Sequence, residues 1–165
     1  MNEVLPNILA LDLGTKCGYA YNTGELFCSG TWVLAAPKEI REWGKSRLTR
    51  RDDPRVTRLC EKVSGLPEFD VLSFEDVQFS SYTLATQLWS ALRSAAWLCV
   101  KRKHTECVPV KTLKLFATGA GNSTKDAMER ALRRTSYWKV GISEDTVDAV
   151  WVWLWSQKNL NRMKI

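Results

Sequence analysis

Short apolar runs separated by polar turns open the chain and predict three adjacent strands. Residues 8–13 read ILALDL, a nearly continuous apolar run that is typical of a central strand covered on both faces. After a turn at Gly14, residues 18–21 and 26–34 favour two further strands, joined by the turn 22–25. Because tight turns join neighbouring strands in antiparallel fashion, we expect an antiparallel meander.

Strand and helix patterns alternate along the rest of the chain. Residues 39–64 favour helix with a break at Pro54, and strands are expected at 71–77 and 105–110. Further helices are predicted over residues 82–102, 111–117, 124–134 and 143–159, the last capped by Ser143. A meander followed by alternating strands and helices predicts an α/β fold: a mixed five-stranded sheet with helices on both faces. No linker interrupts the pattern, so residues 1–165 are expected to form one domain.

Charge and composition narrow the classes of function. The chain has 24 Lys and Arg against 18 Asp and Glu, a net charge of +6, which favours polyanionic partners. The five cysteines show no metal-ligand spacing and are expected to be buried free thiols in a reducing compartment. No apolar run approaches the ~20 residues that span a bilayer, and the N-terminus lacks a signal-peptide pattern. We therefore expect a cytoplasmic protein with no membrane partner.

Acidic residues occur in apolar surroundings in three separate segments. Asp12 lies near the end of the first predicted strand, where an unpaired carboxylate would be costly to desolvate. Glu75 and Asp76 repeat this pattern in the fourth strand, and strand alternation sends their side chains to opposite faces. Only one of the two can therefore join Asp12. Asp145 and Asp148 share one face of the last helix through their i, i+3 spacing.

These acids have two interpretations. Taken singly, each has a structural explanation: backbone N–H groups or a lysine satisfy a buried Asp, and acids at a helix N-terminus complement the helix dipole. Taken together, converging carboxylates remain ionised only with cations between them. Oxygen ligands suit Mg²⁺ or Mn²⁺, and two such ions roughly 3.5–4 Å apart, clamping a phosphodiester, are a common use of such a cluster.

Motifs across nearly the whole chain resemble those of RuvC-like Holliday junction resolvases. They cover that family's opening strand and turn, its second acid, its lysine–glycine–lysine segment and its closing acidic pair. In chain order, the matching positions are residues 8–15 and 18–20, Glu75 with Val77, Val110 with Lys111, residues 118–121, Lys125 and residues 145–149. Each motif is weak alone, but their order and spacing together are specific.

The resemblance implies a ribonuclease-H-like fold and a homodimeric, metal-dependent endonuclease that acts on four-way or branched DNA. It leaves Asp76 on the other face of the sheet. The residues that it implies as ligands of two Mg²⁺ or Mn²⁺ ions per active site are Asp12, Glu75, Asp145 and Asp148. Lys111 and Lys125 become candidates for DNA phosphate contact or for charge stabilisation in catalysis, against the alternative of solvated helix lysines.

One position departs from the family pattern. The family often has an aromatic residue three positions after the second acid, where it engages unstacked bases, and this chain has Gln78 there. Phe79, one position later, is the candidate for that DNA contact. Because a one-residue slip reverses the facing of a strand residue, core packing is the alternative for Phe79.

A basic segment precedes the fourth strand. Residues 41–62 contain eight Lys and Arg against four acids. Within it, Arg47, Arg50 and Arg51 interleave with Trp43, a combination that suits phosphate contact and base stacking. An ordinary solvated helix is the alternative. Basic residues at 101–103 and 133–134 either extend this path or favour helix C-termini.

Two helices have more apolar surface than one core requires. The predicted helix 82–102 has a wide apolar face that could cover the core and still leave room for a partner, with a fully buried helix as the alternative. One stripe of that face consists of Ala85, Leu88, Leu92, Ala95 and Cys99. On the last helix, Trp151, Trp153 and Trp155 point in different directions, so at least one is expected off the core.

The interpretation that covers most of these features is a homodimeric Holliday junction resolvase that nicks two strands symmetrically in DNA recombination or repair. A broader branched-DNA or flap nuclease with the same site is an alternative. A catalytically silent nucleic-acid-binding subunit of the same fold is another. The complete set of acids argues against silence, because buried acids without a metal would destabilise the fold.

Overall fold

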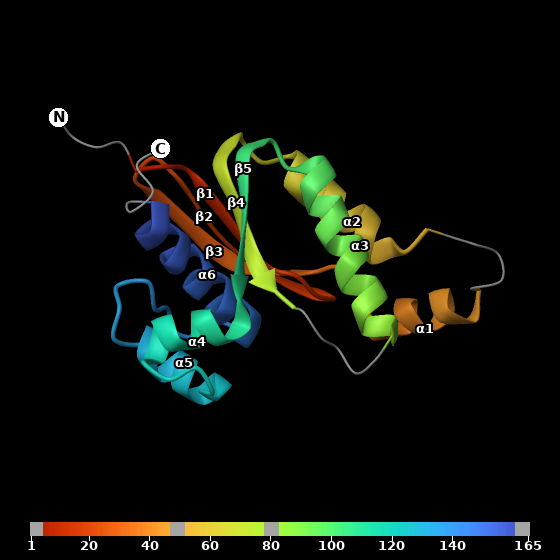
Figure 1. Cartoon of the computed structure of the whole chain (residues 1–165). Helices are drawn as coiled ribbons and strands as arrows, with labels where there is room; N and C mark the ends of the chain where they lie inside the picture. The colour runs from red at the N-terminus through yellow and green to blue at the C-terminus, as the bar shows by residue number, and fades with distance from the viewer. Residues whose placement is uncertain (1–4, 47–51, 78–82, 161–165) are drawn as a thin grey trace.

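A mixed five-stranded sheet forms the centre of the molecule (Figure 1). The computed structural model describes residues 5–46, 52–77 and 83–160. The strands are β1 (Ile8–Asp12), β2 (Lys16–Thr23), β3 (Leu26–Val33), β4 (Phe69–Asp76) and β5 (Arg102–Pro109), in the order β3-β2-β1-β4-β5. Antiparallel pairing joins β1, β2 and β3, whereas β4 is parallel to both β1 and β5. The predicted meander and α/β sheet are confirmed.

Helices cover both faces of this sheet, as predicted (Figure 1). They are α1 (Pro37–Lys45), α2 (Pro54–Ser64), α3 (Thr83–Cys99), α4 (Val110–Thr118), α5 (Lys125–Leu132) and α6 (Glu144–Leu160). On one face α6 packs along β1 and β2 with α4 and α5 beside it, and on the other face α2 packs against α3. No helix within the described ranges is long and apolar enough to cross a bilayer.

The apolar run of β1 serves both faces. Ile8 and Ala10 belong to the core under α6, whereas Leu9 and Leu11 belong to the core under α2 and α3. All four side chains are fully buried. Alternation along the strand therefore explains why this segment is apolar throughout.

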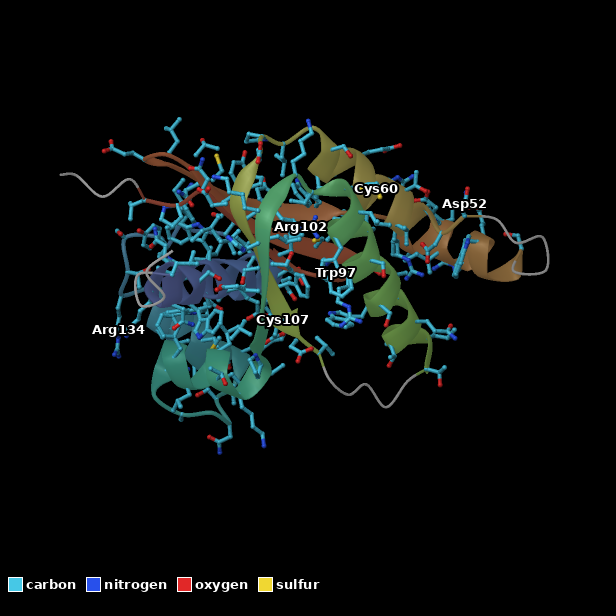
Figure 2. All side chains as sticks on the ribbon, turned by 45° about the horizontal axis from the view of Figure 1, so that its top comes forward. Asp52, Cys60, Trp97, Arg102, Cys107 and Arg134 are labelled. Carbon is cyan, nitrogen blue, oxygen red and sulfur yellow. The ribbon has the colours of Figure 1, made fainter. Side chains whose placement is uncertain are left out.

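Two predictions for residues 82–103 were wrong: the end of the helix and the place of the basic residues at its C-terminus. The helix predicted over 82–102 ends at Cys99, and Arg102 already pairs with Phe69 as the first residue of β5. The basic residues 101–103 thus belong to the approach and start of an edge strand; Figure 2 labels Arg102 and Trp97 in this region. Arg102 Nη1 donates to the carbonyl of Trp97 at 2.5 Å. Lys103 forms an ion pair with Asp70 at 2.7 Å.

Burial shows which residues of the apolar stripe belong to the core, and it corrects the expectation for the cysteines. Leu92 is fully buried and Ala95 nearly so, which makes these two members of the stripe core residues. All five cysteines are free, but of these only Cys17 is buried, and Cys28 and Cys107 are exposed because they lie on the two edge strands. On α6, Trp151 and Trp153 are buried and Trp155 is half-buried at the margin of the core.

Candidate active site

Asp12 and Glu75 lie side by side on the α6 face of the sheet. The parallel register of β1 and β4 pairs Leu11 with Phe74, so the next residues of both strands are neighbours at the strand ends. Ala10 faces α6, and alternation places Asp12 on the same face. Phe74 belongs to the opposite core, so Glu75 faces α6 and Asp76 faces away. The sequence pattern had left open which of these two acids joins Asp12.

The first turn of α6 brings two more carboxylates to this edge of the sheet. Ser143 caps the helix as predicted: its Oγ accepts a hydrogen bond from the N–H of Thr146 at 3.1 Å, and its carbonyl accepts one from Val147 at 3.0 Å. The helix meets β2 at Gly18, where an added Cβ would lie 1.9 Å from the carbonyl oxygen of Asp145. Gly18 pairs with Asp12 in the sheet. Four carboxylates lie near enough at this edge to act on one another's charge, and we call them the acidic cluster: Asp12, Glu75, Asp145 and Asp148.

Burial and mutual repulsion act together on the acidic cluster. Burial raises the pKa of Asp12 well above its usual value, and the charges of Asp148, Glu75 and Asp145 raise it further. Burial, followed by the charge of Asp148, raises the pKa of Glu75 to about 7. Burial also raises the pKa of Asp148, and Asp145 and Glu144 add to that shift. The cluster therefore holds more negative charge than its surroundings compensate.

Two lysines offset part of this charge. Lys125, the first residue of α5, places Nζ 3.8 Å from Asp148 Oδ2 and 3.3 Å from Glu144 Oε2. Burial opposes the charged form of Lys125, but Asp148, Glu144 and Asp12 raise its pKa. Lys114 on α4 lowers the pKa of Glu75 and Asp148 as well. The sequence motifs point to Lys125 but not to Lys114.

The signal that points to Lys114 is helical spacing. It lies three residues after Lys111, so both lie on nearly the same side of α4. Lys111, the predicted phosphate contact, is exposed in the first turn of that helix. Lys114, about one helical turn after Lys111, is the α4 residue whose charge acts on Glu75 and Asp148.

The acidic cluster matches a hard divalent cation in charge and in ligand type. It offers carboxylate oxygens from two strands and one helix, and these are the ligands that Mg²⁺ and Mn²⁺ prefer. In the part of the chain that the structure describes, no three His, Cys, Asp or Glu side chains converge closely enough to hold an ion as they stand. The carboxylates would therefore have to draw closer together to coordinate one.

The predicted DNA contacts fall largely outside the described residues. This holds for Arg47, Arg50, Arg51 and Phe79, whose roles stay predictions. Two neighbouring arginines of the basic segment are engaged within the protein. Arg55 forms an ion pair with Asp53 at 2.7 Å and lies 5.4 Å from the centroid of the Trp43 ring. Arg58 forms an ion pair with Glu39 at 2.5 Å, so neither charge is fully available to DNA.

The fold is shared with solved structures of very different sequence. Thermus thermophilus RuvC in complex with a Holliday junction substrate aligns with a TM-score of 0.65 at 13% identity, over 93% of this chain and 96% of that one. The yeast mitochondrial Holliday junction resolvase Ydc2 aligns with a TM-score of 0.54 at 12% identity, over 98% of this chain and 82% of that one. No protein-family model and no curated protein matches the sequence. The expected ribonuclease-H-like fold of RuvC is confirmed.

Proposed function

We propose that the protein is a metal-dependent endonuclease that resolves four-way DNA junctions by paired, symmetric nicks. The main support is the meeting of four carboxylates from β1, β4 and α6 at one edge of the sheet. The second support is the fold, which a RuvC solved in complex with a Holliday junction substrate also has. Structural acids with no chemical task would not need to gather where burial and repulsion raise the pKa of three of them.

In this proposal, the acidic cluster holds one or two Mg²⁺ or Mn²⁺ ions, with two per site the expected number. When bound, such ions lower the pKa of a water nucleophile and neutralise charge on the leaving oxygen of a phosphodiester. Asp12 and Glu75 supply ligands from rigid strand ends, and α6 supplies the other two. Lys125 lies against Asp148, where its ammonium can balance the acids and contact a non-bridging phosphate oxygen.

The DNA would approach over the ends of β1 and β4. Lys114 and Lys125 lie on α4 and α5 at this edge and supply positive charge beside the acids. Arg47, Arg50 and Arg51 are proposed to contact the phosphate backbone, and Phe79 to contact unpaired bases. The net charge of +6 is consistent with a nucleic-acid substrate.

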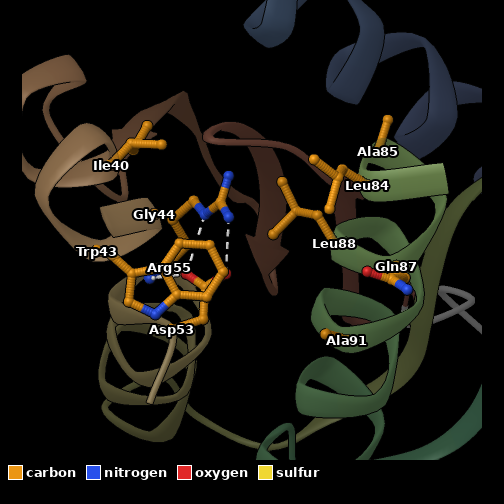
Figure 3. A pocket seen from close by; sticks show the side chains of 10 residues that line it. All are labelled: Ile40, Trp43, Gly44, Asp53, Arg55, Leu84, Ala85, Gln87, Leu88 and Ala91. Atoms are coloured by element: carbon orange, nitrogen blue, oxygen red, sulfur yellow. Dashed lines mark hydrogen bonds and ion pairs between the residues drawn. The ribbon is translucent and has the colours of Figure 1, made fainter. Parts of the chain in front are cut away.

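A second copy of the chain completes the proposal. A four-way junction has near two-fold symmetry, so paired nicks require two active sites related by a two-fold axis. An apolar cavity of about 620 Å³ opens between α1 and α3 (Figure 3), with Ile40 and Trp43 on one wall and Leu84 and Leu88 on the other. Leu84 exposes 64% of its surface. We place the homodimer contact on this side of α3.

A cleavage assay with four substrates tests the proposal. A four-way junction, a flap, a linear duplex and an RNA hairpin are each incubated with Mg²⁺, Mn²⁺ or EDTA. We expect two symmetric nicks in the junction with either metal, and none in EDTA. Equal cleavage of the flap would favour the broader branched-DNA nuclease. Junction binding without cleavage in any metal would favour the catalytically silent subunit.

A further inference from the structure

Four residues form one row across the sheet on its α6 face. Asp12 pairs with Gly18, and Gly18 pairs with Thr31, while Glu75 stands beside Asp12 on β4. Two of these positions belong to the acidic cluster. The third position is Gly18, where the backbone of Asp145 on α6 occupies the space that a side chain would need. The last position, Thr31, has no part in the proposed reaction so far.

Thr31 bonds to the first turn of α6 from across the sheet. Its Oγ1 lies 2.5 Å from Ser143 Oγ and 2.8 Å from Thr146 Oγ1, and the two helix hydroxyls lie 3.0 Å apart. Three hydroxyls have three protons, so each can donate one bond and accept one around a closed ring. We call these three residues the hydroxyl ring.

The hydroxyl ring fixes the start of α6, beside the two acids of that helix. Asp145 lies between Ser143 and Thr146 in sequence, and Asp148 follows two residues later. The Thr146 side chain is buried, with only 3% of the residue exposed, so its hydroxyl depends on these protein partners. A shift of this turn would move both helix carboxylates relative to Asp12, because Asp12 is held by the strand.

We propose that Thr31 is a positioning residue that sets, through Ser143 and Thr146, where Asp145 and Asp148 stand relative to Asp12. The inference rests on the proposed function, in which the acidic cluster holds a divalent cation. Thr31 hydrogen-bonds to the hydroxyls of Ser143 and Thr146. Thr31 therefore acts on the geometry of the metal ligands and takes no part in the chemical step itself. Groups that hydrogen-bond metal ligands directly commonly change metal affinity by about 10- to 100-fold when they are removed. Thr31 acts one step further out, through Ser143 and Thr146, so we expect the lower end of that range.

Metal titration of the DNA-free protein tests the inference without reference to cleavage. Thr31→Val keeps the shape of the side chain and removes the hydroxyl, whereas Thr31→Ser keeps the hydroxyl. Thr105→Val is the matched control, because Thr105 lies on the other edge strand and its hydroxyl accepts a bond from Arg102 Nε at 2.9 Å. Calorimetric titration with Mn²⁺ should show about tenfold weaker binding for Thr31→Val. Thr31→Ser and Thr105→Val should bind like the wild type.

The outcomes separate this inference from the proposed function. A wild-type protein that binds no Mn²⁺ overturns the proposed function and the inference with it. Wild-type affinity in Thr31→Val, or an equal loss in Thr31→Ser, overturns the positioning role alone. If Thr31→Val does not fold, Ser143→Ala opens the ring from the helix side. Unchanged Mn²⁺ affinity in that variant would likewise overturn the positioning role.

Discussion

Asp12 is a buried carboxylate whose charge is opposed both by burial and by three neighbouring acids. It is held by a strand whose other residues are fully buried, and three further acids raise its pKa beyond the effect of burial. A lone structural acid would have a cation or several N–H groups as partners. Here the compensating charge comes from Lys125, which it shares with Asp148 and Glu144. Without a cation, burial and repulsion among these acids lower the stability of the fold. A bound divalent cation would offset that repulsion.

Asp12→Asn should abolish cleavage and spare DNA binding. The substitution keeps the side-chain volume and removes one charge from the acidic cluster, so junction cleavage in Mg²⁺ should fall by several orders of magnitude. Binding of the junction in EDTA should persist or tighten, because the DNA phosphates meet less repulsion. Gel-shift and cleavage assays on one four-way junction measure both effects.

Asp76→Asn is the control for that substitution. Asp76 lies one residue after Glu75 at the end of β4 and faces the opposite side of the sheet. We expect this variant to cleave at the wild-type rate. Normal cleavage by Asp12→Asn, or an inactive Asp76→Asn, would contradict the site.

The metal-free protein should become more stable as the pH falls from 8 to 6. The pKa of Glu75 is raised to about 7 in the folded state, above the ordinary value of a glutamate, and the pKa values of Asp12 and Asp148 are also raised. The folded state therefore binds more protons than the unfolded state in this range, so stability is lost as the pH rises through about 7. Tm in EDTA measures the effect, and Glu75→Gln should flatten the curve. A Tm that rises from pH 6 to pH 8 would contradict these shifts.

At the scale of elements, α3 combines two roles along one helix. Its buried side contributes Leu92, Ala95 and Ala96 to the core over the sheet. Its first turns carry Leu84 and Leu88 on the wall of the cavity that faces α1. An apolar helix side that its own core does not cover is typical of a contact surface.

Leu84→Glu should convert the proposed homodimer into monomers and leave the fold intact. Leu84 is 64% exposed, so the charge stays in water in the monomer and is buried only in the dimer. Light scattering should show half the wild-type mass, with Tm nearly unchanged. Leu98→Glu is the control, since Leu98 is 85% exposed at the other end of α3. A wild-type monomer, with and without DNA, would contradict the symmetric mechanism.

A charge at Leu92 of the same helix should instead destabilise the fold itself. Because it is fully buried in the core, Leu92→Glu would place an unpaired charge in apolar surroundings and cost about 4 kcal/mol or more. The apolar stripe along α3 thus contains residues of two kinds that only their burial distinguishes.

At the scale of the whole molecule, the excess of positive charge should govern affinity for DNA. Each phosphate contact releases counterions, and the logarithm of the binding constant falls with the logarithm of salt concentration by about 0.9 per contact on duplex DNA. Combined Arg47→Ala, Arg50→Ala and Arg51→Ala should therefore weaken binding and make this slope shallower. Fluorescence anisotropy at several salt concentrations measures it. An unchanged slope would make these arginines ordinary solvated side chains.

Local patterns in the sequence were enough to predict the order of strands and helices and to single out the acids as candidate site residues. Turn residues at 14 and 22–25 predict the meander because tight turns leave few ways to connect strands. The continuous apolar run of β1 predicts a strand covered on both faces, and an acid inside such a run is conspicuous because it is costly to bury. These features depend only on neighbours along the chain.

The residue pattern by itself did not decide which of these residues come together; the family resemblance implied an answer, and the tertiary structure gives the physical reason. Alternation puts Glu75 and Asp76 on opposite faces, but only the register with β1 and the side that α6 covers show which one faces Asp12. The same holds for Lys114, for the core position of Leu92 and for the bonds of Thr31, which joins β3 to residues more than a hundred positions away. A periodic pattern defines the faces of an element, whereas packing between distant elements decides what each face touches.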